Sequence, residues 1–225
     1  MIDDGIFGLY AILTDPVIGY EACARAVVNQ GVRFLQLRMK NKPHKAVLDM
    51  AYRIREITRD TDTLFIMNDD VRVAIEVDAD GVHLGQEDMS IVSAEILWGN
   101  EDKIFGLSTH NETQKNNAFH TMPDYIGVGP VFPTPTKEIP DQALGLEQMR
   151  SIIKDVLIPT VAIGGIDEEN LHDVLCHGAI NFAVVRAINQ SLEPEIVISR
   201  LMKIWHMRYP DIGTFGHGNV NEDML

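Results

Sequence analysis

Amide and cationic side chains alternate along one short β-rich run of the sequence. Successive side chains of a strand point to opposite sides, so Gln36, Arg38 and Lys40 share one face, and Leu37 and Met39 lie on the other. Cations that point into a protein interior are costly unless an anion meets them. We therefore interpret this run as a phosphate or pyrophosphate site, although a solvated strand end can have the same composition.

Two aspartates follow the next two β-rich runs. Asp69 comes after Leu64–Met67, and Asp88 comes after Gly81–Leu84. If these runs are neighbouring parallel strands, the two carboxylates lie side by side. Mg²⁺ prefers one or two carboxylates, with phosphate oxygens and waters completing its octahedron. An isolated aspartate is more typical of a turn or a helix N-cap, but this pair beside two cations predicts a magnesium–pyrophosphate site.

The later β-rich runs end in hydroxyls, glycines and further cations, which suit an anionic ligand. Glycines let backbone N–H groups approach a phosphate, and barrel phosphate sites often use the loops after strands seven and eight. The residues concerned are Ser108, the segment Thr134-Pro135-Thr136-Lys137, the pair Gly164-Gly165, and Arg186.

Other polar residues near these positions have structural interpretations. His83 shares a face with two glycines and could reach a ligand, but a histidine in that setting is more often structural. Thr109 or Asn111 is expected to cap the following helix. The residues around His110 do not form the pattern of a nucleophilic triad.

The elements that must position these residues are eight β-rich runs that alternate with helical patterns such as Ala46–Thr58 and Leu144–Val156. This alternation predicts an α/β protein with parallel strands, and at this length a single (β/α)₈ TIM barrel over residues 1–208. A doubly wound open sheet has the same local pattern. The predicted strands are Ile6–Leu13, Val32–Arg38, Leu64–Met67, Gly81–Leu84, Ile104–Ser108, Tyr125–Gly129, Pro159–Ile163 and Asn181–Val185.

Two segments interrupt this pattern. The proline-rich stretch Pro130–Ala143 is predicted to be a long loop after the sixth strand, on the barrel face where active sites are built. Residues 209–225 form an acidic tail rich in Gly and Asn, with no apolar period, and we expect this tail to be poorly anchored.

Composition narrows the classes of function. The 225 residues contain 19 Lys and Arg against 33 Asp and Glu, a net charge of −14, which argues against nucleic acid as a partner but leaves small phosphorylated molecules open. The 2 cysteines cannot build a disulfide framework. Because the sequence shows no signal peptide or membrane span, we expect a cytoplasmic protein, and a homo-oligomer stays open.

Taken together and in order, these motifs resemble the thiamine-phosphate synthase family, which consists of (β/α)₈ barrels. The resemblance extends from Gly8-Leu9-Tyr10 to Ala187. It implies a transferase that joins 4-amino-2-methyl-5-(diphosphooxymethyl)pyrimidine to 4-methyl-5-(2-phosphooxyethyl)thiazole. The products would be thiamine phosphate and pyrophosphate, and Mg²⁺ would be the cofactor.

The resemblance also assigns roles by position. It implies that Asp69 and Asp88 bind Mg²⁺, and that Arg38, Lys40, Lys137 and Ser108 take part in catalysis. The implied pyrimidine-diphosphate residues are Gln36, Leu37, Arg38, Met39, Lys40, Asn68, Ser108 and Lys137. The implied thiazole-phosphate residues are Thr134, Thr136, Gly165, Val185 and Arg186. Further candidates for substrate binding, not assigned to one substrate, are His83, Gln86, Pro135 and Gly164.

Two departures and three alternatives accompany this resemblance. Met39 stands where the family usually has Glu, and Arg186 where it usually has Ser. The related thiazole tautomerases share the barrel and the thiazole end, and His110 would be a candidate for proton transfer there. A non-catalytic sensor of thiamine phosphate is a second alternative, disfavoured by the aspartate pair. Another phosphate-binding barrel of amino-acid biosynthesis is the third.

Overall fold

Eight parallel strands form a closed barrel in sequence order in the computed structural model, which describes residues 5–99, 102–134 and 142–212. β1 pairs with both β2 and β8, so no strand has a free edge. The predicted TIM barrel is therefore confirmed. The strands are β1 (Leu9–Leu13), β2 (Phe34–Leu37), β3 (Leu64–Asn68), β4 (Gly81–Leu84), β5 (Ile104–Thr109), β6 (Tyr125–Val128), β7 (Thr160–Ile163) and β8 (Asn181–Val184).

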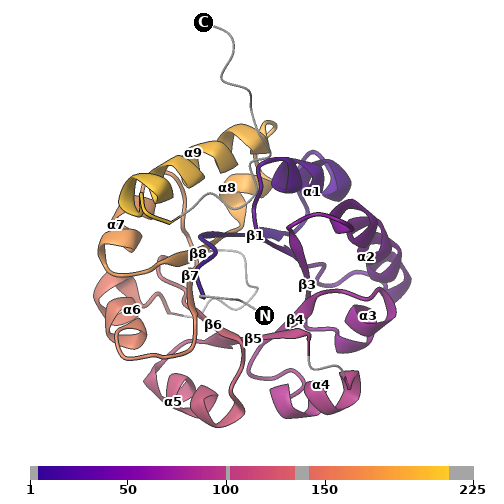
Figure 1. Cartoon of the computed structure of the whole chain (residues 1–225), viewed down its shortest axis with the longest axis horizontal. Helices are drawn as coiled ribbons and strands as arrows, with labels where there is room; N and C mark the ends of the chain where they lie inside the picture. The colour runs from indigo at the N-terminus through magenta and orange to yellow at the C-terminus, as the bar shows by residue number, and fades with distance from the viewer. Residues whose placement is uncertain (1–4, 100–101, 135–141, 213–225) are drawn as a thin grey trace, which may run out of the picture.

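The helices form a ring outside the strands, and α9 lies beside α1 where the ring closes (Figure 1). In the described residues they are α1 (Tyr20–Asn29), α2 (His44–Thr58), α3 (Val71–Glu76), α4 (Ile91–Trp98), α5 (Glu112–Thr121), α6 (Gly145–Ile153), α7 (Leu171–Cys176), α8 (Arg186–Asn189) and α9 (Pro194–Arg208). The helices α1, α2 and α9 each bury one mostly apolar stripe. In α2 this stripe contains Val47, Ala51 and Ile54, at the spacing that the sequence predicts.

The buried side chains form two clusters that the barrel wall separates. β2 shows the division clearly, since Leu35 and Leu37 pack toward the helices while Phe34 belongs to the cluster inside the barrel. The inner cluster is rich in aromatic rings, and Phe7 stacks on Phe34 with ring centroids 4.2 Å apart. Because the inner cluster fills the barrel, the barrel interior is a packed core rather than a pore.

Two buried asparagines hold the seam where the first strand meets the last. The Asn181 side chain accepts hydrogen bonds from the backbone N–H groups of Phe7 and Gly8 at 2.7 and 3.0 Å, and donates to the backbone of Gly5 and Thr160. At the opposite end of the seam, Asn189 donates to the carbonyl groups of Ile12 and Val185 and accepts from Thr14 N–H. These side chains replace ladder hydrogen bonds beyond the strand ends.

Most predicted element bounds agree with the structure, with two informative exceptions. The first strand begins at Leu9 rather than Ile6, because Gly8 has φ +67° and breaks the extended run. The tail prediction is wrong for its first residues, because the Tyr209 hydroxyl donates to the Ala179 carbonyl oxygen at 2.9 Å and Ile212 packs against the core. Residues 213–225 lie outside the described residues.

Candidate active site

The polar face of β2 reaches the mouth of the barrel at the carboxyl ends of the strands. Gln36 is buried inside the barrel, Arg38 is half-buried at the rim, and Lys40 is exposed beyond it. The Lys40 ammonium group forms an ion pair with the carboxylate of Asp69, which follows β3. Met39 packs toward the outer core, as the alternation predicts. The structure thus brings an amide, two cations and one predicted metal ligand to one side of the mouth.

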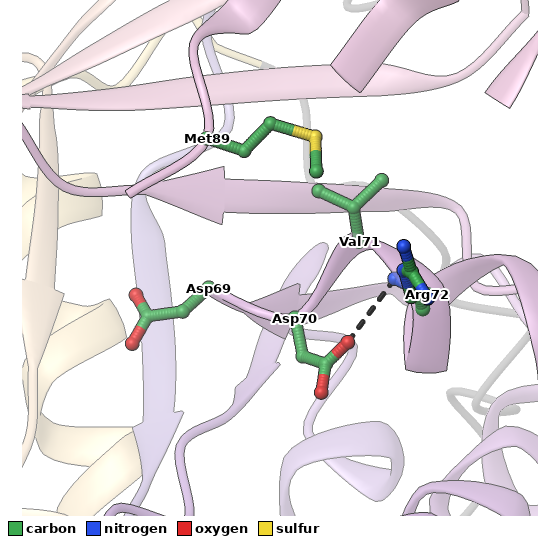
Figure 2. A pocket seen from close by; sticks show the side chains of 5 residues that line it. All are labelled: Asp69, Asp70, Val71, Arg72 and Met89. Carbon is green, nitrogen blue, oxygen red and sulfur yellow. Dashed lines mark hydrogen bonds between the residues drawn. The ribbon is translucent and has the colours of Figure 1, made fainter. Parts of the chain in front are cut away.

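The adjacent aspartates Asp69 and Asp70 point their carboxylates in different directions (Figure 2). Asp70 caps α3, and its carboxylate accepts hydrogen bonds from the N–H groups of Arg72 and Val73 at 3.1 and 3.0 Å. Asp69 has φ +63°, a left-handed conformation that turns its side chain toward Lys40. Asp69 thus faces the cation at the mouth, whereas Asp70 is engaged at the start of α3.

The second predicted metal ligand, Asp88, lies close to the first. Burial raises the pKa of Asp69, the charge of Asp88 raises it further, and Lys40 lowers it. One oxygen of Asp88 accepts a hydrogen bond from Gly85 N–H at 2.7 Å, and a Cβ at Gly85 would lie 2.9 Å from that oxygen. A glycine at this position therefore leaves room for the carboxylate where it lies.

The donor set at the mouth fits a magnesium ion shared with a phosphate ligand. The charge of Asp88 raises the pKa of Asp69, so a cation between the two carboxylates would relieve their repulsion, and Mg²⁺ takes its remaining ligands from phosphate and water. Within the described ranges, no three His, Cys, Asp or Glu side chains gather in a way that could hold a metal ion by themselves. A fully protein-ligated site is thus not formed by these residues, whereas a substrate-completed one would be.

A chain of hydrogen bonds crosses the barrel interior from Gln36 to Ser108. Gln36 Nε2 donates to the Tyr10 hydroxyl at 2.8 Å, and the hydroxyls of Tyr10 and Tyr125 are 2.9 Å apart. The Tyr125 hydroxyl lies 3.0 Å from His83 Nδ1, and His83 Nε2 lies 2.9 Å from Ser108 Oγ. Three predicted residues on three strands are thereby connected through two tyrosines.

Sequence reasoning did not identify Tyr10 and Tyr125 as part of the site. Each lies in an apolar β-rich run, where a tyrosine looks like an ordinary strand residue. The available signal was the neighbouring glycines, since a Cβ at Gly106 would lie 2.2 Å from the Tyr125 ring and 2.6 Å from His83. Gly127 likewise leaves room beside the His83 ring. Small residues on β5 and β6 therefore make space for this chain of polar groups.

Of two further predicted residues, Gln86 contacts Ser108, and Asn68 lies beside His83 on the neighbouring strand. Gln86 Nε2 donates to the Ser108 carbonyl oxygen at 2.6 Å, so the loop after β4 contacts the end of β5 through this side chain. Asn68 ends β3 directly opposite His83 of β4. The backbone and hydroxyl of Ser108 are thus held from two sides.

The opposite side of the mouth is built from backbone. Gly164 and Gly165 have φ of +103° and +68°, and a Cβ on either would lie 2.7 Å or less from Pro130 or Phe132. Asn170 holds this turn by donating to the Gly165 carbonyl oxygen at 2.8 Å. Val185 and Arg186 lie at the junction of β8 and α8, where Arg186 is exposed and contacts Gln190. Thr134 is half-buried, while Pro135, Thr136 and Lys137 lie outside the described residues.

The helix-cap prediction after β5 is right for one residue and wrong for the other. Asn111 caps α5 by accepting a hydrogen bond from Gln114 N–H at 2.9 Å. Thr109 is fully buried and instead donates to the Gly127 carbonyl oxygen of β6. His110 Nδ1 donates to the Gly129 carbonyl oxygen at 2.6 Å, a contact that holds β5 to the end of β6.

Comparison with known proteins identifies the family. A family model described as thiamine monophosphate synthase matches residues 9–188, which is most of the chain and every described strand. The chain belongs to this family. Membership in the thiamine monophosphate synthase family makes it a transferase, in agreement with the resemblance of its motifs.

Individual relatives agree with the family assignment. The thiamine-phosphate synthase of Archaeoglobus fulgidus is 41% identical over 197 residues, which cover 85% of this chain and 90% of the relative. That of Dictyoglomus thermophilum is 46% identical over 167 residues, 74% of each chain. The structure of thiamine phosphate pyrophosphorylase from Pyrococcus furiosus superimposes with a TM-score of 0.83 at 33% identity, covering 92% of this chain and 99% of that one.

The structure also bears on membrane association of this thiamine monophosphate synthase family member. Among the helices in the described residues, none has the length and apolar composition that crossing a lipid bilayer requires.

Proposed function

We propose that this protein joins the pyrimidine diphosphate and the thiazole phosphate named above to form thiamine phosphate and pyrophosphate. The observation that carries the proposal is the convergence of Gln36, Lys40, Asp69 and Asp88 at one side of the barrel mouth. An amide suits a pyrimidine edge, and cations beside paired carboxylates suit a magnesium diphosphate. The names of the relatives support the same reaction.

The proposed reaction exchanges one bond for another at the pyrimidine methylene carbon. The bond from that carbon to the diphosphate oxygen breaks, and its electron pair leaves with pyrophosphate. The thiazole nitrogen then donates its lone pair to the carbon. No atom of the protein needs to bond to either substrate, which agrees with the nucleophile-free pattern of the sequence.

The chain's own residues would act by position and charge. Arg38 and Lys40 would stabilise the negative charge that develops on the departing pyrophosphate. Asp69 and Asp88 would hold Mg²⁺, which when bound supplies further positive charge to that leaving group. We assign Lys137, Thr134, Pro135 and Thr136 to the substrates by their place in the sequence.

Gly164, Gly165, Val185 and Arg186 would receive the thiazole phosphate on the opposite side of the mouth. Glycines with positive φ leave backbone N–H groups accessible to a phosphate, and Arg186 adds a donor of its own. Placing the two substrates on opposite sides of the mouth orients the thiazole nitrogen for attack on the methylene carbon.

Pyrophosphate release tests the proposal, with neighbouring aspartates as a matched pair. Asp69→Asn should reduce the rate about 100-fold, because one predicted metal ligand loses its charge. Asp70→Asn should leave the rate within about twofold, because asparagine caps a helix as well as aspartate does. EDTA should stop release by the wild-type protein.

Two outcomes would contradict the proposed function. One is a folded wild-type protein that releases no pyrophosphate when both substrates and Mg²⁺ are present. The other is equal activity of the Asp69→Asn and Asp70→Asn variants. Conversion of a thiazole phosphate isomer without any pyrimidine would instead indicate the tautomerase activity.

A further inference from the structure

The interior hydrogen-bond chain has a direction, because its two tyrosines each carry a single proton. Tyr10 and Tyr125 are buried at 2% and 0% exposure, inside the barrel wall. Burial raises the pKa of both hydroxyls well above the ordinary value, so both are neutral and protonated at physiological pH. Each hydroxyl therefore donates one hydrogen bond and accepts the others.

Counting protons from Gln36 fixes the direction at every step. Gln36 Nε2 donates to the Tyr10 oxygen, so the Tyr10 proton is left for its remaining partner, the Tyr125 oxygen. Tyr125 then has to donate its own proton to His83 Nδ1. If Tyr125 donated to Tyr10 instead, neither Gln36 Nε2 nor the Tyr125 hydroxyl would accept the Tyr10 proton. A buried donor without an acceptor costs about 1–3 kcal/mol.

The far end of the chain determines what Ser108 can do. If His83 Nδ1 accepts a proton from Tyr125, the ring proton is on Nε2, which faces Ser108 Oγ at 2.9 Å. The Ser108 oxygen then accepts that hydrogen bond, and the Ser108 proton remains for a second partner. Gln86 fixes the Ser108 backbone at the same time.

We propose that Tyr10 and Tyr125 are positioning residues that hold His83 in its Nε2-protonated tautomer and thereby present the Ser108 hydroxyl as a hydrogen-bond donor to the mouth. Its acceptor would be a ring nitrogen or a phosphate oxygen of the pyrimidine diphosphate. The ligand part of this inference rests on the proposed function, whereas the tautomer part does not.

Nitrogen-15 NMR of the histidine side chains in the ligand-free protein tests the tautomer directly. The His83 signal is identified by its loss in His83→Gln. In the wild type we expect protonated Nε2 and unprotonated Nδ1. In Tyr125→Phe, Nδ1 loses its donor, and we expect the Nδ1-protonated form to be populated. Tyr209→Phe is the control, since Tyr209 contacts Ala179 at the other end of the barrel.

Two results would overturn the tautomer inference. One is an Nδ1-protonated His83 in the wild type, which would reverse the chain. The other is an unchanged His83 signal in Tyr125→Phe. If that single variant fails to fold, Tyr10→Phe/Tyr125→Phe replaces it. The single variant leaves the Tyr10 proton buried without an acceptor, whereas the double variant removes that proton as well. The same His83 signal is measured in that variant.

Steady-state kinetics test the consequence for the ligand. Tyr125→Phe should raise KM for the pyrimidine diphosphate about tenfold and leave KM for the thiazole phosphate within twofold. Ser108→Ala should show the same split, and Tyr209→Phe should show neither change. Equal increases in both constants would refute a role through Ser108. A wild-type protein that forms no product would refute the proposed function alone, because the NMR result stands without it.

Discussion

The ammonium group of Lys40 forms an ion pair with the carboxylate of Asp69, although the two residues lie beyond the ends of different strands. Lys40 is half-exposed and Asp69 is three-quarters buried. The pair keeps a cation beside a predicted metal ligand at the place where a diphosphate would bind. We expect a charged group in this position to contribute to substrate affinity more than to folding, because exposed ion pairs stabilise a protein little.

Removing this cation should therefore weaken substrate binding without unfolding the protein. We expect Lys40→Met, which keeps the apolar stem, to raise KM for the pyrimidine diphosphate about tenfold, or ~1.4 kcal/mol, and to lower kcat as well, because the same cation would stabilise the departing pyrophosphate. Lys42→Met is the control, because Lys42 pairs with Asp15 on the surface at 3.0 Å. Initial-rate measurements at several substrate concentrations distinguish the two variants. Equal KM values for both would show that Lys40 does not contact the diphosphate.

A methyl group at Gly85 should disturb the second aspartate. The added Cβ would lie 2.9 Å from Asp88 Oδ2, so the carboxylate has to move. We expect Gly85→Ala to raise the Mg²⁺ concentration for half-maximal rate severalfold while the melting temperature changes by about 2 °C or less. A Mg²⁺ titration of pyrophosphate release provides the measurement. Unchanged magnesium dependence would argue against Asp88 as a ligand.

The departure from the family pattern at Arg186 should affect one substrate selectively. Arg186 is exposed at the start of α8, close to the glycine turn after β7 in the order of the barrel. We expect Arg186→Ser to change KM for the thiazole phosphate and to leave kcat within about twofold, because the guanidinium would contact the phosphate and not the reacting atoms. A selective loss of kcat would contradict this expectation.

The asparagine at the start of β8 should be important for stability. Its side chain makes hydrogen bonds to four backbone groups, of Phe7, Gly8, Gly5 and Thr160. Asn181→Ala should lower the free energy of unfolding by about 3 kcal/mol, because buried backbone groups lose their partners. Asn29→Ala, which removes an exposed contact with Glu195, should cost about 0.5 kcal/mol or less. Urea unfolding of the two variants tests this difference.

The two cysteine thiols should react with a thiol reagent at different rates at the same pH. Burial raises the pKa of Cys23 from 9.0 to about 12, whereas Cys176 is exposed. We expect a maleimide at pH 8 to label Cys176 and to spare Cys23 in the folded protein. Because the folded state keeps the Cys23 proton when the unfolded chain has lost it, this thiol's contribution to stability is present below pH 9 and is lost as the pH rises toward 12. Rapid labelling of both thiols at pH 8 would contradict this picture.

The sequence predicts the barrel and the strand ends well, because both depend on local patterns. β4 spans Gly81–Leu84 in the prediction and in the structure alike, and the polar face of β2 follows from simple alternation. The division of labour between Asp69 and Asp70 is not predictable in this way. It depends on the left-handed backbone at Asp69, which the residue type permits but does not dictate.

The interior chain of hydrogen bonds is even less accessible to sequence reasoning. Tyr10 and Tyr125 are 115 positions apart, and their hydroxyls meet only because β1 and β6 face each other across a closed barrel. Alternation within a strand says which face a tyrosine occupies but not which side chain it contacts across the interior. The packing of the inner cluster decides that contact, and packing is a property of the whole barrel.

The seam held by Asn181 also has a consequence for how the protein is made. Its bonds to Phe7 and Gly8 span 174 and 173 residues, so the first strand leaves the ribosome long before its last partner exists. Until then, β1 has one unpaired edge on the nascent chain, which is the kind of edge that pairs with other chains. The barrel cannot close until β8 has been made, because the free edges of β1 and β7 both pair with that strand. Factors that shield the growing polypeptide would therefore improve the yield of folded protein most while residues before Asn181 are being translated.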